Sequence, residues 1–127
     1  MGSPSAYGRI LVEAGGPVSV VSLLGEHDHS TRPRLEALVA ALLEDREASA
    51  VVVDLSEAEF VNVPILGALK RAHAAAGDQG KRLVVVLPET GASIVRRLFD
   101  VTEAHTFFDL SPSLDDALQA ISESASE

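Results

Sequence analysis

The histidines of the first third of the chain are the first residues whose types could support chemistry. His27 and His29 flank Asp28, and imidazole and carboxylate groups are common zinc ligands. A zinc site needs three or four convergent ligands, whereas two histidines two positions apart at a strand end supply two at most. His73 and His105 lie far away along the chain. We therefore interpret the pair as ordinary polar loop residues and predict no metal site.

Nucleophilic and phosphate-binding chemistry lack their usual motifs. No Gly-x-Ser-x-Gly elbow supports a Ser-His-Asp arrangement, and no GxGxxG stretch occurs. The segment 77–81 contains two glycines and a lysine, but it ends a predicted helix and precedes a strand, the reverse of a phosphate loop. Acidic pairs at Glu57/Glu59 and Asp115/Asp116 fall in polar loops or first helical turns, where acids are common. The sequence predicts no enzyme and no cofactor.

Composition narrows the class of protein further. The 127 residues, 46% of them apolar, predict one globular domain with a buried core. The absence of cysteine excludes disulfides, thiolate catalysis and cysteine metal sites. A net charge of −9, from 19 acids and 10 bases, disfavours nucleic acid as a partner. No apolar run approaches the roughly 18 residues needed to cross a bilayer and no signal peptide opens the chain, so we expect a cytoplasmic protein.

The stretch 51–76 must position the loop in which function is expected. Val51–Leu55 is a short, β-branched run typical of a buried strand. Asn62 offers a side-chain oxygen to the free amides of a helix start, and Pro64 falls in the first turn, where a missing N–H is tolerated. An apolar stripe follows at Ile65, Leu66, Leu69 and Ala72. A strand, a loop and a helix N-terminus in this order often bind ligands or partners in α/β domains.

The remaining elements alternate in type. Further strands are expected at Tyr7–Ala14, Val18–Leu24, Leu83–Leu87 and within His105–Leu110, the first two as a hairpin. Segment 25–31 is expected to be a polar loop. The fold class is therefore α/β: a single domain with a mixed, mostly parallel sheet of about five strands and about four helices, in the order β-β-α-β-α-β-α-β-α. Residues 1–6 are expected to form a disordered lead-in, 7–121 the domain and 122–127 a frayed tail.

Capping residues and apolar stripes predict the other helices. Ser30 or Thr31, Thr90 and Ser113 are the expected N-terminal caps, and segment 77–80 ends the central helix. The first helix is expected to bury Leu35, Leu38, Val39 and Leu42. The third is expected to bury Ile94, Val95, Leu98 and Phe99.

Taken together, these segments resemble the STAS domain, a family that includes anti-sigma factor antagonists and the cytoplasmic domains of sulfate transporters. The resemblance begins at Gly25-Glu26-x-Asp28-x-x-Thr31-x-x-x-Leu35 and continues through Val51-Val-Val-Asp54-Leu55-Ser56 to Phe60 and Leu66-Gly67. It extends through Leu83–Val86, Val95–Thr102 and Leu114-x-x-Ala117-Leu118. No single motif is specific, but their combination covers nearly the whole chain.

The resemblance implies a phosphorylation switch that this chain lacks. Antagonists of the family carry Asp-Ser-Ser/Thr-Gly after the central strand, and a partner kinase that is also the anti-sigma factor phosphorylates the second hydroxyl. The corresponding residues here are Asn62, Val63, Pro64 and Ile65. Proline has no hydroxyl, so Pro64 is a degenerate phosphoacceptor position.

Three functions stay open. The first is a binding module that docks a protein partner, an anti-sigma factor of the histidine-kinase-like ATPase type. Its expected surface is formed by Glu26, Asp28, His29, Thr31, Asn62, Val63, Pro64 and Ile65. The second is a scaffold of a regulatory assembly or an accessory subunit of a membrane transport ATPase. A small-molecule or nucleotide sensor ranks last, because the loop lacks cationic ligands.

Overall fold

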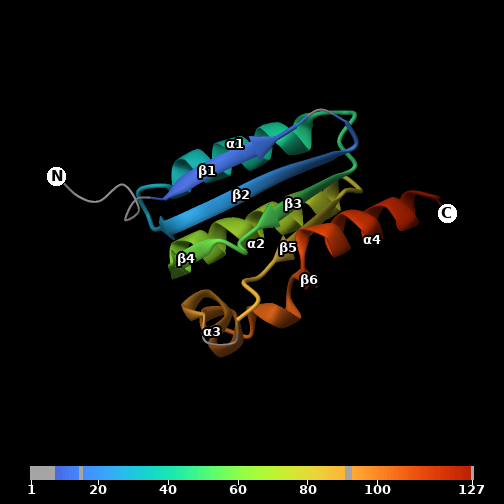
Figure 1. Ribbon diagram of the computed structural model, residues 1–127. Coiled ribbons are helices and arrows are strands. Elements are labelled where there is room, and N and C mark those ends of the chain that lie inside the picture. Colours follow the sequence, from blue (N-terminus) through green and yellow to red (C-terminus); the bar gives the residue numbers. More distant parts are fainter. Residues whose placement is uncertain (1–7, 15, 91–92, 127) are drawn as a thin grey trace.

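A six-stranded mixed sheet carries the fold, with helices on both of its faces (Figure 1). The computed structural model describes residues 8–14, 16–90 and 93–126, so the expected lead-in at 1–6 lies outside the described residues. The elements follow in the order β1 (Arg9–Glu13), β2 (Val18–His27), α1 (Arg32–Glu44), β3 (Ala50–Asp54), β4 (Ala58–Val61), α2 (Val63–Asp78), β5 (Arg82–Val86), α3 (Ile94–Val101), the 3-10 turn η2 (Ala104–Thr106), β6 (Asp109–Ser111) and α4 (Leu114–Ser126). The predicted α/β class, the helices and the opening hairpin are confirmed.

The sheet runs in the order β1-β2-β3-β5-β6, and β4 pairs with β2 away from this path. β1 is antiparallel to β2, and every other pairing is parallel. β4 was not expected, because Ala58–Val61 is short and contains a glutamate. β2 is also longer than predicted and includes Gly25, Glu26 and His27, which were assigned to a loop.

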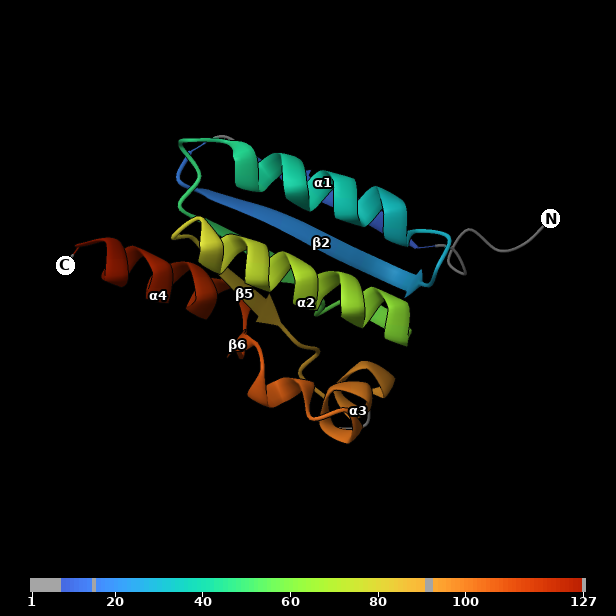
Figure 2. The ribbon, with the colours of Figure 1, turned by 180° about the vertical axis from the view of Figure 1, so that it is seen from behind.

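Two hydrophobic clusters hold the layers together. The larger lies between the sheet and the helices α1, α2 and α3 and contains Leu35, Val53, Ile65 and Phe99. The smaller lies under α4, where Ala117 and Ile121 pack against Val52 and other strand residues. Figure 2 shows α1 and α2 side by side on one face of the sheet. Their N-termini lie at the same end of the molecule, where the site is built.

The start of α2 forms as predicted. The Oδ1 atom of Asn62 accepts a hydrogen bond from the Ile65 N–H over 3.3 Å, and Pro64 falls in the first turn. At the other end, Gly80 adopts a positive φ of 70°, which glycine tolerates without steric penalty. Ser113 likewise caps α4, since its hydroxyl oxygen accepts from the Asp116 N–H over 3.0 Å.

Two helices differ from the prediction in detail. α3 begins after Ser93 rather than Thr90, and the Ser93 hydroxyl oxygen accepts from the Val95 N–H over 3.1 Å. With this start, Ile94 points outward and is 60% exposed, so its assignment to the core was wrong. In α1, Leu43 joins the buried stripe, whereas Leu38 is only partly buried.

The end of α1 is tied to the start of β5. The Lys81 ammonium donates to the carbonyl oxygen of Leu43 and, over 2.8 Å, to that of Asp45. A cation at this position satisfies carbonyls that have no partner within the helix and opposes the negative end of the helix dipole.

Candidate partner-binding surface

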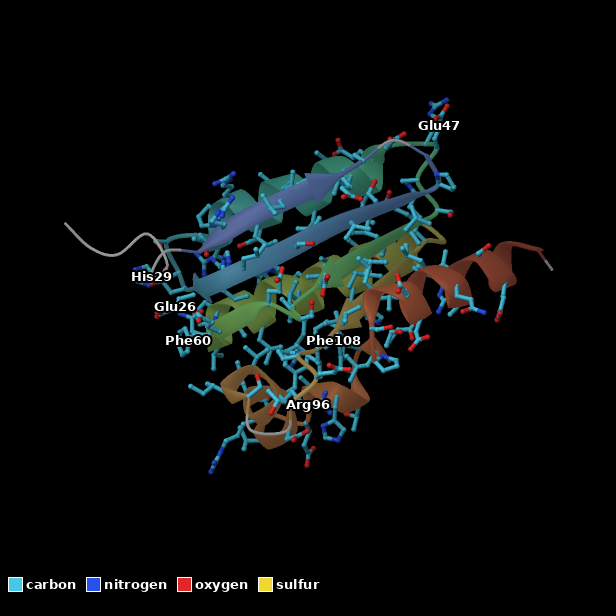
Figure 3. All side chains as sticks on the ribbon, viewed as in Figure 1. Glu26, His29, Glu47, Phe60, Arg96 and Phe108 are labelled. Carbon is cyan, nitrogen blue, oxygen red and sulfur yellow. The ribbon has the colours of Figure 1, made fainter. Side chains whose placement is uncertain are left out.

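The pairing of β2 with β4 brings the two predicted halves of the surface together. In this parallel register Glu26 lies opposite Phe60 and His27 lies opposite Val61. The loop that follows β2 and the start of α2 that follows β4 therefore emerge side by side. In Figure 3 the labelled Glu26, His29 and Phe60 gather at this end of the ribbon.

Phe60 lies beside this candidate surface and was not among the residues selected from the sequence. It is half-buried on β4, next to Glu26 across the strand pair. The sequence does not show that the segment 58–61 pairs with β2. Without β2 beside it, the segment 58–61 does not look like a strand.

Asp28 organises the loop before α1. Its Oδ1 atom accepts hydrogen bonds from the Ser30 N–H over 2.8 Å and from the Ser30 hydroxyl over 2.6 Å. These bonds favour the ionised carboxylate and lower the pKa of Asp28 below its ordinary value. The residue is partly exposed, and one of its carboxylate oxygens is engaged within its own turn.

His27 is not the exposed loop residue that was expected. It closes β2 with 0% exposure, and its Nε2 atom lies 3.0 Å from the Leu24 carbonyl oxygen. The backbone of Gly8 passes so close that an added Cβ would lie 2.6 Å from the His27 Cε1 atom. Burial lowers the pKa of His27 and favours the neutral ring. His29, in contrast, is exposed.

Thr31 links these residues to α1. It occupies the N-cap position, yet its hydroxyl does not cap the helix and donates to the Asp28 carbonyl oxygen over 3.1 Å. The same oxygen lies 3.2 Å from the His27 Nδ1 atom. Thr31 therefore connects the buried histidine to the turn that presents Asp28 and His29.

The start of α2 offers few free donors to an anion. Pro64 has no N–H, the Ile65 N–H bonds to the Asn62 side chain, and the Leu66 N–H donates to the Asn62 carbonyl oxygen over 3.1 Å. A phosphate group at a helix N-terminus depends on such amides. This helix start is capped by its own residues.

Exposure divides the α2 residues that were assigned to the surface. Val63 is 62% exposed, and Asn62 and Pro64 are half-buried. Ile65 is 0% exposed and belongs to the core, so it cannot contact a partner and its assignment to the surface is corrected. On the next turns of α1 and α2, Glu36 forms ion pairs with Arg32 over 3.2 Å and with Arg71 over 3.4 Å, beside the exposed residues.

The described part of the chain contains neither a group of three or more histidine and acidic side chains that could hold a metal ion nor a helix suited to crossing a membrane.

Both the sequence and the fold of this chain are similar to those of known proteins. A family model described as "Mlab, STAS domain" matches residues 10–122. Among solved structures, an anti-sigma factor antagonist from Mycobacterium paratuberculosis is 36% identical, with a TM-score of 0.77 over 94% of this chain and 97% of that one. No curated protein matches the chain significantly.

More distant structures share the fold alone. The Bacillus cell fate determinant SpoIIAA in its phosphorylated form is 13% identical, with a TM-score of 0.68 over 89% of this chain and 99% of that one. A murine anion transporter, Slc26a9, is 16% identical, with a TM-score of 0.64 over 84% of this chain but 18% of that one.

Proposed function

We propose that this chain, which belongs to the STAS domain family, is a non-enzymatic regulatory module that docks a kinase-type anti-sigma factor. The family membership confirms the resemblance found in the sequence. The 36% identical relative is itself an anti-sigma factor antagonist, which supports a protein as the partner. We place the docking surface on Glu26, Asp28, His29, Thr31, Phe60, Asn62, Val63 and Pro64.

One observation carries the proposal: Val63 is 62% exposed at the start of α2, next to Asn62 and at the same end of the sheet as Asp28. The Asp28 side chain is held by a hydrogen bond within its own turn and the Asn62 side chain by one to the first turn of α2, so their orientation needs little ordering on binding. An exposed apolar side chain within a polar rim is typical of the centre of a protein interface.

We further propose that docking is not switched by phosphorylation at the start of α2. Pro64 supplies no hydroxyl to an incoming γ-phosphate, and its neighbours leave few amides to hold a phosphate there. SpoIIAA, whose fold this chain shares, has been solved in a phosphorylated form, so the fold itself is compatible with the modification. In this chain, the proline at position 64 leaves no hydroxyl to be phosphorylated there.

The test combines capture with matched surface variants. The tagged chain is used to capture proteins from a native lysate, mass spectrometry identifies them, and the affinity of the purified partner is then measured by calorimetry. Val63→Asp should weaken binding at least about tenfold, because it places a charge at the interface centre. Val101→Asp is the control, since Val101 is 69% exposed on α3.

Equal affinity of both variants for the partner would refute the proposed surface. Capture of a transport ATPase in place of an anti-sigma factor would favour the accessory-subunit alternative, in which the exposed Val63 forms part of a permanent contact.

A further inference from the structure

The open edge of β1 is the second surface of interest, and it lies outside the docking surface. β1 ends the sheet and pairs on one side with β2 (Figure 1). Among the described residues no strand pairs with its other side. Helix α1 contacts β2 and β3 and lies on one face of the sheet (Figure 2).

The middle of this edge strand is apolar and partly exposed. Leu11 at its centre and Val12 beside it are 46% and 39% exposed, and neither a lysine nor a proline interrupts the strand. Natural edge strands are commonly blunted by such residues, because unpaired backbone groups recruit another strand. The charges of β1 lie at its two ends instead, Arg9 at the start and Glu13 at the close.

The placement of these charges identifies an occupant. We propose that β1 is a self-association surface, on which a second copy of this chain pairs its own β1 antiparallel about Leu11. In this register Arg9 lies opposite Glu13 of the second copy, and Glu13 lies opposite Arg9 of the second copy. Two cross-strand ion pairs then flank a contact between the two Leu11 side chains.

The register follows from the faces of the strand. Side chains alternate between the two faces, so a two-fold axis perpendicular to the sheet must pair residues of the same face. Centring the pair on Ile10 or Val12 also satisfies this rule, but it shortens the overlap and sets Arg9 or Glu13 against Leu11. Centring it on Leu11 uses the whole strand and pairs each charge with its opposite.

Self-association leaves the docking surface free. β1 begins next to His27, because Gly8 packs against that ring. Antiparallel pairing therefore places the two docking surfaces at opposite ends of a continuous sheet, where each remains open to a partner.

A charge-reversal cycle tests the proposal. Sedimentation equilibrium of the full chain up to about 200 µM should show a monomer–dimer equilibrium. Arg9→Glu or Glu13→Arg alone should raise the dimer Kd about tenfold or more, because each turns both ion pairs into like-charge pairs. The double variant Arg9→Glu/Glu13→Arg should return the Kd to near the wild-type value. Glu89→Arg, at an exposed position after β5, is the control for net charge.

Circular dichroism melting of each variant verifies that it is folded, and these exposed positions should tolerate the change. A wild-type chain that stays monomeric over this concentration range would overturn the proposal and leave the edge to a strand of a different protein. A dimer that both single reversals leave unchanged, or that the double variant fails to restore, would place the dimer contact elsewhere and equally refute the proposed pairing.

Discussion

The hydroxyl oxygen of Thr31 lies 3.2 Å from Nδ1 of His27, while Nε2 of the same ring lies 3.0 Å from the Leu24 carbonyl oxygen. In a neutral ring whose Nε2–H donates to the Leu24 carbonyl oxygen, Nδ1 is an acceptor and shares the single Thr31 hydroxyl proton with the Asp28 carbonyl oxygen, which lies 3.1 Å from the same hydroxyl oxygen. The His27 ring thereby links the end of β2 to Thr31, the residue before α1, beneath the proposed docking surface.

The burial of His27 predicts a dependence of stability on pH. Its pKa is lowered from the ordinary 6.5, mainly by desolvation, although the Leu24 and Arg9 backbone and the Asp28 charge act in the opposite direction. The unfolded chain therefore binds a proton first, and the free energy of unfolding should be highest above pH 6.5 and decrease as the pH falls towards the folded-state pKa.

The measurement is urea unfolding between about pH 8 and 5, with His27→Gln and His29→Gln as the matched pair. His27→Gln should flatten the decrease and His29→Gln should leave it unchanged, since His29 is exposed. Wild type and His27→Gln with the same slope would contradict this role of His27.

Charge and turn geometry can be separated at Asp28. Asp28→Ala removes the acceptor of both Ser30 bonds and should lower the Tm, whereas Asp28→Asn retains an Oδ1 acceptor and should keep the Tm closer to that of wild type. If the charge contacts a basic partner, both variants should weaken partner binding and its dependence on salt. If only Asp28→Ala loses affinity for the partner, the geometry of the turn and not the charge of Asp28 supports partner binding. Thermal melts and calorimetry at two salt concentrations measure these effects.

The start of α2 predicts a phosphorylation result. With a partner kinase and Mg-ATP, the wild-type chain should gain no phosphate between Val61 and Leu66, whereas Val63→Ser/Pro64→Ser should gain one if the kinase recognises the surface. Ile65 is left unchanged, because replacing this buried residue by glycine should cost about 3–5 kcal/mol of stability. Phosphopeptide mapping measures the outcome, with Val101→Ser as the control hydroxyl. A phosphate on wild-type Ser56 that alters partner binding would show that a switch persists nearby.

The hydrogen bonds from Lys81 to the end of α1 predict that two lysine-to-methionine substitutions will lower the stability by different amounts. Lys81→Met removes the donor to the last carbonyls of α1 and should lower the free energy of unfolding by about 1–2 kcal/mol. Lys70→Met should cost less, about 0.5–1 kcal/mol, because that ammonium lies 5.7 Å from the Phe107 ring centroid in a cation–π contact. Denaturant titration of both variants compares them directly. If both variants lose the same free energy of unfolding, the hydrogen bonds from Lys81 to the carbonyl oxygens add no stability beyond that of a lysine charge.

The sequence predicts those parts of the fold whose signals are local. The Asn62 cap, the Pro64 turn and the glycine end of α2 act within a few residues, and each was found where it was expected. The strand β4 could not be predicted, because four residues with a glutamate among them become a strand only beside β2.

The site shows the same division between local and tertiary signals. Loop residues such as Asp28 and Asn62 could be selected by type, because polar side chains at strand ends and helix starts are visible in the sequence. The burial of His27 and Ile65 depends on packing from distant elements, including Gly8 for the histidine. Residue type alone favours a polar histidine in a loop and does not reveal the strand that covers it.

The order of the strands in the sheet has a consequence for how the chain is made. Apart from β4, the strands lie across the sheet in the order in which a ribosome would deliver them, from β1 to β6. Each new strand can pair with a neighbour that has already been synthesised. The sheet can therefore grow by adding strands at one edge, without inserting a strand between two others. The hairpin of β1 and β2 needs residues no further than His27 and can form first. The edge that we assign to self-association is therefore available before the remaining strands of the domain have left the ribosome.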